Sequence, residues 1–263
     1  MIIKIIKKIL DMNYLMKLDN YFADREIYKE INLQGKTLLL YAPNHLIKWR
    51  VKTFFSKEPN TLNWIDSFKK DEIFWDIGAN IGLYSLYAAV KYNLQVVSFE
   101  PSTNNTRILS RNISKNNCFN KIKLFTIPLI DKENSFLTLH ESSKIEGSAH
   151  NSFGNNLDQD GKNFNSTHKY TIYGTTINYL LDHKILELPN HIKIDVDGFE
   201  HLILKGADKY LSNINIKSVL VELNENYKEQ SDSIFKIMEK NNFKVDKKDS
   251  LGDGFYNYIF KKN

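Results

Sequence analysis

The stretch Phe74-Trp75-Asp76-Ile77-Gly78-Ala79-Asn80-Ile81-Gly82 decides the fold of this 263-residue chain. The compact apolar run 72–77 leads into two glycines spaced G-x-x-x-G, and residues 83–92 then have the pattern of a buried helix. This order predicts a β-strand, a tight turn and an α-helix. Glycines in such a turn let the backbone approach a ligand closely, at the N-terminus of the helix that follows.

The same alternation continues along the chain. Further strands are expected over 95–99, 121–127, 191–196 and 218–223, and further helices over 104–116, 177–183, 199–211 and 227–241. Strands that alternate with helices predict βαβ units and a parallel sheet. Residues 243–246 and 255–260 are predicted to close the chain as an antiparallel hairpin, with Gly252 and Gly254 in its turn.

Two acidic residues accompany the glycine turn. Asp76 precedes it directly, and Glu100 ends the second predicted strand, 22 positions after Gly78. A dinucleotide site would instead have G-x-G-x-x-G, and a carboxylate at position 76 would repel a pyrophosphate. A sulfonium ligand with an α-amino group would not be repelled, so Asp76 favours S-adenosylmethionine over NAD. Glu100 has the spacing expected of a carboxylate that binds the ribose hydroxyls of a nucleoside.

Three further carboxylates follow later strands. Asp195 and Asp197 come at the end of 191–196, and Glu222 comes at the end of 218–223. Open α/β sheets bind their ligands at the carboxyl ends of the strands. Asp195 and Asp197 therefore suit either a divalent cation or a general base, with Glu222 on the same rim. Capping of the helix that begins near Phe199 is the alternative role for one of the two aspartates.

The first 56 residues are expected to form an extension that packs on a larger domain, 57–263. Residues 1–30 are predicted to be helical and 36–42 to form a strand. Ile2, Ile5, Ile6 and Ile9 recur at helical spacing with lysines opposite them, which indicates an amphipathic helix. This helix would pack on the domain or on a second subunit, or alternatively lie on a membrane surface. Oligomeric state is left open by the sequence.

The composition narrows the class of protein. The net charge is +5, but the lysines are scattered instead of forming a basic track, so nucleic acid is not an expected partner. No apolar run reaches the length of a transmembrane helix, and the single cysteine excludes a disulfide framework. A cytoplasmic protein is the expectation. Residues 141–168 are rich in Ser, Asn, Gly and Asp, and predict either a loop that covers a substrate or a disordered segment.

Taken together, these stretches resemble the FkbM family of methyltransferases over roughly residues 57–245. The resemblance is carried by residues 74–85, 98–102, 192–200, 204–207 and 221–223, with Asn105 and Asn112. It implies an α/β, Rossmann-like class I methyltransferase fold, with a mostly parallel seven-stranded sheet that ends in the antiparallel hairpin. It also implies S-adenosylmethionine as methyl donor and O-methylation of a sugar, a glycan or a secondary metabolite. The family commonly has glutamate where this chain has Asp197.

The resemblance also suggests a set of site residues. The cofactor-binding candidates are Asp76, Gly78, Asn80, Gly82, Glu100, Pro101, Ser102 and Asp131. The catalytic candidates are Asp195, Asp197 and Glu222, which are also the candidate ligands if a divalent metal is used. We expect Asp195 to act as base or metal ligand, with the other two carboxylates in support. A nicotinamide-dependent oxidoreductase and a non-catalytic Rossmann-like binding module are the alternative functions.

Overall fold

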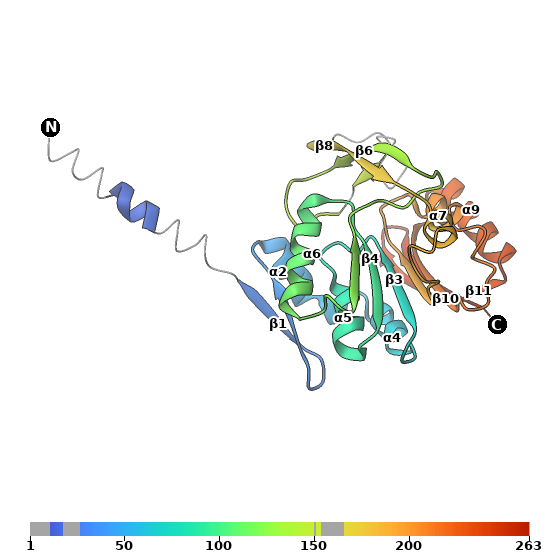
Figure 1. Cartoon of the computed structure of the whole chain (residues 1–263), viewed down its shortest axis with the longest axis horizontal. Helices are drawn as coiled ribbons and strands as arrows, with labels where there is room; N and C mark the ends of the chain where they lie inside the picture. Colours follow the sequence, from blue (N-terminus) through green and yellow to red (C-terminus); the bar gives the residue numbers. More distant parts are fainter. Residues whose placement is uncertain (1–10, 18–26, 150, 154–165, 263) are drawn as a thin grey trace.

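The computed structural model describes residues 11–17, 27–149, 151–153 and 166–262, which form a layered α/β structure with two smaller sheets (Figure 1). The central sheet has seven strands in the order β11-β12-β10-β9-β3-β4-β5. Their bounds, in chain order, are β3 Ile73–Ile77, β4 Gln95–Phe99, β5 Ile122–Phe125, β9 His191–Ile194, β10 Ser218–Asn224, β11 Phe243–Gly252 and β12 Phe255–Lys262. The predicted Rossmann-like methyltransferase fold is confirmed.

The strand pairing explains where a ligand can bind. β3 runs parallel to both β4 and β9, and β10 runs parallel to β9. β12 is the antiparallel strand, inserted between β10 and β11 as the predicted hairpin requires. The chain leaves β3 toward β4 and β5 and later returns to the other side of β3 with β9. This reversal of strand order opens a crevice at the carboxyl ends of β3 and β9.

Helices cover both faces of the sheet. Their bounds are α2 His45–Lys52, α3 Phe54–Lys57, α4 Pro59–Asp66, α5 Leu83–Tyr92, α6 Thr103–Lys115, α7 Ile177–Asp182, α8 Glu200–Lys205 and α9 Lys228–Lys240. The helix predicted over 199–211 is shorter than expected. A Cβ on Gly206 would lie 2.1 Å from the carbonyl oxygen of Ile130, so the chain packs tightly there and continues as turns instead of helix.

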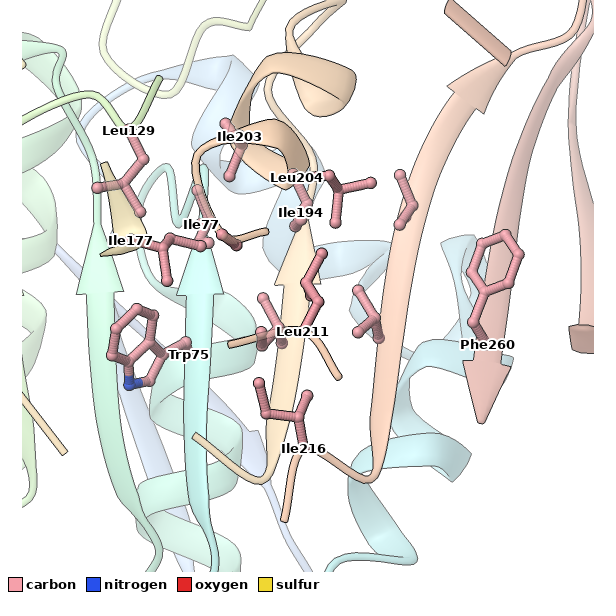
Figure 2. Close-up of a cluster of buried hydrophobic side chains, with 14 of the residues drawn as sticks. Trp75, Ile77, Leu129, Ile177, Ile194, Ile203, Leu204, Leu211, Ile216 and Phe260 are labelled. Atoms are coloured by element: carbon pink, nitrogen blue, oxygen red, sulfur yellow. The ribbon is translucent and has the colours of Figure 1, made fainter. Parts of the chain in front are cut away.

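The buried side chains form one large cluster on each face of the sheet. Trp75 and Ile77 point to the face that is covered by α7, α8 and α9 (Figure 2). Phe74 points to the opposite face, which is covered by α4, α5 and α6. Successive residues of a strand face opposite sides, so a strand buried on both sides is apolar throughout. This explains the continuous apolar runs in the sequence.

The extension before α4 differs from the prediction. Residues 1–10 and 18–26 lie outside the described residues, and 11–17 are helical. The predicted helix is wrong over 28–30, because β1 (Tyr28–Asn32) pairs with β2 (Thr37–Tyr41) as a hairpin. The turn at Gln34 and Gly35 has positive φ angles of 55° and 98°. No helix in the described ranges is long and apolar enough to cross a membrane.

The hairpin is held on α6 by two asparagines. Asn112 accepts a hydrogen bond from the backbone N–H of Tyr41, and Asn116 both accepts from and donates to the backbone of Leu39. Leu38 and Leu40 are fully buried in the same cluster as α5. The hairpin therefore packs on α6 and on the cluster that includes α5, while the division of the chain at residue 57 stays a prediction.

A three-stranded sheet, β7-β6-β8, lies beyond the carboxyl ends of β3 and β4 (Figure 1). Its strands are β6 Ser135–Glu141, β7 Ser152–Phe153 and β8 His168–Gly174. The segment predicted as a loop over 141–168 is thus partly ordered as β7. Residue 150 and residues 154–165 lie outside the described residues. The described part of this segment reaches the crevice, as the substrate-covering interpretation requires.

Candidate functional site

A cavity of about 540 Å³ lies at the carboxyl ends of β3, β4, β9 and β10. The glycine turn and the end of β4 line one part of it, and β9 and β10 line another. α2 and α3 form a further wall, in which Ile47 of α2 belongs to the same buried cluster as Ile81 of the glycine turn. Phe153 and the segment 142–149 cover it from the small sheet. The cavity therefore occupies the crevice where the strand order reverses, and it has two chemically different ends.

The glycine turn forms one wall through Gly78 and Asn80. Gly78 has a φ of +83°, and a Cβ at this position would lie 1.8 Å from the carbonyl oxygen of Asp195. Glycine is thus the residue that the close contact with β9 admits. Gly82 is not part of the wall. It caps α5 with a φ of 84°, and a Cβ there would lie 2.1 Å from Leu109, so its role is to let α5 and α6 pack closely.

Asp76 lies beneath the turn and does not line the cavity. Its carboxylate is fully buried and accepts hydrogen bonds from the N–H of Ser85 at 3.1 Å and from the hydroxyl of Ser85 at 2.5 Å. The hydroxyls of Ser85 and Ser98 are 2.7 Å apart. Asp76 thus ties the first turn of α5 to β3, while its other oxygen is buried without a hydrogen-bond partner among the described residues. Its predicted contact with a cofactor stays a prediction.

Glu100 faces the cavity and is held by backbone donors. Its carboxylate accepts from the N–H of Asn80 at 2.7 Å and from the N–H of Ser102 at 2.9 Å. Burial raises the pKa of Glu100 to about 7, although these hydrogen bonds act in the opposite direction. Each oxygen keeps a lone pair for a further donor. Glu100 can therefore accept two hydroxyl groups from a ligand while its own position is fixed.

Of the remaining cofactor-binding candidates, one lines the cavity and the others do not. Pro101 lines the cavity beside Glu100. Ser102 is buried and N-caps α6, where its hydroxyl accepts from the N–H of Asn105. Asp131 is exposed and is not among the lining residues. The structure thus brings Gly78, Asn80, Glu100 and Pro101 to the cavity, and leaves Asp76, Gly82, Ser102 and Asp131 outside it.

Asp195, Asp197 and Glu222 line the other end of the cavity, together with Lys193. The strand register explains this arrangement, because Lys193 pairs with Asp76 on one side and with Leu220 on the other. Asp195 and Glu222, each two residues further along neighbouring parallel strands, therefore share the same face and the same rim. Lys193 is fully buried, with its Nζ 2.6 Å from Asp195 Oδ2 and 5.0 Å from the ring centre of Tyr84.

The pKa values of the two carboxyls differ in direction. Burial raises the pKa of Asp195, but the charge and hydrogen bond of Lys193 lower it more, so that it lies below its usual range. Burial raises the pKa of Glu222, and the charges of Asp195 and Glu58 raise it well above its usual range. Among the described residues, Glu222 has no lysine or arginine at ion-pair distance. Once ionised, Glu222 is the stronger base of the two, while the expectation for Asp195 as base stays a prediction.

The use of Asp195, Asp197 and Glu222 as metal ligands stays a prediction. Among the described residues, no three Asp, Glu, His or Cys side chains lie close enough to hold one. One Asp195 oxygen is already bound by the ammonium of Lys193. Glu200 accepts from the N–H groups of Val196 and Gly198, just before α8. Capping by one of the two aspartates stays a prediction.

Sequence reasoning missed the wall that α2 and α3 provide. Trp49 and Arg50 of α2 and Lys57 of α3 line the cavity, next to the buried Glu58. Lys57 and Glu58 form an ion pair at 3.1 Å. The spacing of Leu46, Trp49 and Arg50 places them on one helical face and could have indicated a shared surface. Lys193 was also missed, although a lysine within a buried apolar strand marks an unusual site.

A strap of three residues, Glu146, Gly147 and Ser148, joins α2 to the glycine turn, and Ser148 lines the cavity. Its backbone carbonyls accept hydrogen bonds from Asn44, the N-cap of α2, from Arg50 on α2 and from Asn80 in the glycine turn. Asn105 of α6 also donates to the carbonyl of Ser148 and accepts from the N–H of Gly147. These contacts hold α2, the glycine turn and α6 together beside the cavity.

Two curated relatives match part of the chain. The hexuronic acid methyltransferase AglP of Haloferax volcanii is 25% identical over 184 residues, which are 66% of this chain and 65% of that protein. The methyltransferase sdnD of Sordaria araneosa is 30% identical over 169 residues, which are 56% of this chain and 64% of that protein. The chain thus spans slightly less than two thirds of the length of each of these relatives.

Solved structures with a similar arrangement share little sequence. A precorrin-6y C5,15-methyltransferase of Geobacter metallireducens has a TM-score of 0.47 and 13% identity, covering 78% of this chain and 87% of that chain. The P. horikoshii TYW2, in complex with MeSAdo, has a TM-score of 0.47 and 12% identity, covering 90% and 70%. The order of the sheet, and not these scores, defines the fold.

The family is defined by a match to the central part of the chain. The model of the methyltransferase FkbM domain matches residues 76–245, which include the glycine turn, Glu100, Asp195 and Glu222. The match covers more than half of the sequence. The chain belongs to the FkbM methyltransferase domain family.

Proposed function

We propose that this protein transfers a methyl group from S-adenosylmethionine to a hydroxyl group of a sugar. The observation that carries the proposal is the division of one cavity into a nucleoside-binding end at Glu100 and a proton-accepting end at Glu222. The family match supports methyl transfer, and the relative AglP, a hexuronic acid methyltransferase, supports a carbohydrate acceptor. A secondary metabolite with a comparable hydroxyl is the remaining acceptor class.

The residues of the first end fit the donor. Glu100 can accept hydrogen bonds from two ribose hydroxyls. The side-chain oxygen of Asn80 is buried in the cavity wall without a partner among the described residues, so it can accept from the α-ammonium group. The carboxylates of the lining suit a ligand with a positive sulfonium. Gly78 keeps the wall free of a side chain at the carboxyl end of β3.

The residues at the Glu222 end of the cavity would remove a proton from the acceptor hydroxyl and orient it. A bound donor would supply an activated methyl group: as an acceptor oxygen attacks it in line, the C–S bond of the sulfonium breaks and its electron pair stays on the sulfur of S-adenosylhomocysteine. A sugar hydroxyl is a weak acid, and the carboxylate of Glu222 would take its proton as the new C–O bond forms. Asp195, fixed by Lys193, would orient the hydroxyl. The ring of Tyr84 lies beside the ammonium of Lys193, and burial together with the charge of Glu58 raises the pKa of Tyr84 well above its usual range, so it stays neutral.

The test is a calorimetric titration with S-adenosylhomocysteine, with NAD as the control ligand. We expect micromolar binding of S-adenosylhomocysteine and no binding of NAD. A methyl-transfer assay with S-adenosylmethionine and a panel of sugars then identifies the acceptor. Well-folded protein that binds NAD alone would favour the oxidoreductase, and protein that binds neither ligand would favour the non-catalytic module.

Donor affinity is expected to depend on the ionisation of Glu100. With a pKa of about 7, its carboxyl is mostly protonated at pH 6 and mostly ionised at pH 8. The ionised form accepts ribose hydroxyls more strongly, so the Kd for S-adenosylhomocysteine should fall about tenfold between these pH values. Glu100→Gln should bind more weakly and show a flat profile. A wild-type Kd that does not change with pH would contradict this role.

A further inference from the structure

The cavity wall formed by α2 lies outside the part of the chain that the family model matches, since α2 ends at Lys52 and the match begins at Asp76. Trp49 and Arg50 reach the cavity from one face of this helix. Residues on this wall can therefore distinguish this protein from relatives that share only the central domain. The chemistry of the wall indicates which acceptor it would bind.

Arg50 is the cavity cation whose charge is not matched by a direct ion pair. The lysines in the lining, by contrast, are paired: Lys193 is 2.6 Å from Asp195, and Lys57 is 3.1 Å from Glu58. Within the described ranges, no carboxylate lies at ion-pair distance from Arg50. Its charge nevertheless acts on the acceptor end, because Arg50 is one of the cations that lower the pKa of Asp195 against the effect of burial.

The hydrogen bond of Arg50 leaves one edge of its guanidinium group for a ligand. Nε donates to the carbonyl oxygen of Gly147 at 2.8 Å, which fixes the plane of the group. The two terminal nitrogens donate to no described residue. Two parallel N–H groups in one plane match the two oxygens of a carboxylate, and this geometry binds more specifically than a single ammonium group.

Trp49 provides an apolar surface next to Arg50. Its side chain lines the cavity although the residue is 48% exposed. A large aromatic ring that remains exposed at a cavity wall typically serves a binding partner. The C–H groups on one face of a pyranose ring pack well on such an indole. A sugar ring on Trp49 would bring its substituents within reach of the neighbouring arginine.

We propose that the acceptor is an acidic sugar, whose carboxylate is bound by the terminal nitrogens of Arg50 while its ring packs on Trp49. This proposal rests on the proposed function, because it names the substrate class of the same site. It makes Arg50 and Trp49 the residues that determine specificity, and it leaves proton transfer to Glu222. It also explains why an arginine is present at an end of the cavity where carboxylates predominate.

The experiment compares three acceptors that differ in one group: methyl β-D-glucuronide, its uncharged amide, and methyl β-D-glucoside. Methyl transfer is measured as kcat/KM, and acceptor binding is measured by calorimetry on protein loaded with S-adenosylhomocysteine. We expect the glucuronide to exceed both neutral compounds by at least about tenfold, the range of a charged hydrogen-bonded pair. Equal binding of the three compounds, or preference for a neutral one, would overturn the proposal.

Variants test whether Arg50 causes the preference for the acidic sugar. Arg50→Gln should reduce the preference for glucuronide over glucoside to about onefold, and Arg50→Lys should retain only part of it, because one ammonium cannot replace the planar pair. Asn44→Ser is the matched control: it removes a hydrogen bond to the same strap while its hydroxyl can still cap α2. An Asn44→Ser protein that loses the preference as Arg50→Gln does would assign the effect to the strap and reject carboxylate binding.

The two proposals fail in different ways. If S-adenosylhomocysteine does not bind, the proposed function fails. If it binds and sugars are methylated or bound without regard to charge, the proposed function stands and the acidic acceptor is rejected. Circular dichroism and the Kd for S-adenosylhomocysteine show whether Arg50→Gln is folded. Should it not fold, the comparison of the three acceptors with the wild-type protein decides the question by itself.

Discussion

Lys193→Met is expected to lower the free energy of unfolding by about 3–5 kcal/mol, the loss typical of a buried ion pair from which one partner is removed. Methionine has a similar length but no charge. Lys193 is fully buried, and its ammonium is 2.6 Å from Asp195. Burial lowers the pKa of Lys193, but Asp195, Asp76 and Glu58 together raise it above its usual range. Without the lysine, these carboxylates would face one another in a poorly hydrated interior.

Urea unfolding followed by circular dichroism measures the loss. Lys209→Met is the matched control, because Lys209 and Asp182 are also 2.6 Å apart but lie at the surface, so this change should cost less than about 1 kcal/mol. The double variant Lys193→Met/Asp195→Asn should recover part of the stability, since it removes one of the unpaired charges. Similar losses for Lys193→Met and Lys209→Met would show that Lys193 has no special role in the fold.

Glu222→Gln is expected to lower kcat for methyl transfer by about 100-fold to 10,000-fold, the range of a general base, while the Kd for S-adenosylhomocysteine stays within about twofold. The amide keeps the size of the side chain and cannot accept the proton. Since the pKa of Glu222 is raised by burial and by Asp195, wild-type kcat should increase with pH as this carboxyl ionises. The variant should lack this increase.

Glu225→Gln is the control for Glu222→Gln. Glu225 follows the same strand but is bound by Lys248 and Tyr258 at the surface, so its loss should leave kcat unchanged. Steady-state kinetics over pH 6 to 9, with the acceptor found in the sugar panel, provides the comparison. Full activity in Glu222→Gln would exclude this residue as the base. A raised Kd with unchanged kcat would instead place Glu222 in donor binding.

Much of the central domain could be predicted because its signals are local. An apolar run followed by a glycine turn and a helix can only be a βα unit, and β3, α5 and β4 lie where the sequence predicts them. The hairpin of β1 and β2 was harder to predict. Its first strand has a burial pattern of one buried residue in five, so periodicity did not distinguish it from the helical segment before it.

The sequence predicts which edge of the sheet holds the candidate site, but not the role of each residue there. The carboxyl ends of parallel strands bring Glu100, Asp195 and Glu222 together whatever their neighbours are. The direction of Asp76 depends on the alternation along β3, which places it with Phe74 beneath α5. The pairing of Asp195 with Lys193 depends on burial and on the register of β9 against β3 and β10. The i, i+2 spacing of Lys193 and Asp195 indicates a shared face, but not that both side chains are buried and paired.

The strap of Glu146, Gly147 and Ser148 joins three parts of the site into one unit. It is bonded to α2 and its N-cap Asn44, to the glycine turn and to α6. A displacement of the strap breaks the contact that holds Arg50 together with the contact that holds Asn80. A movement of this short segment therefore loosens the wall at α2 and the wall at the glycine turn at the same time.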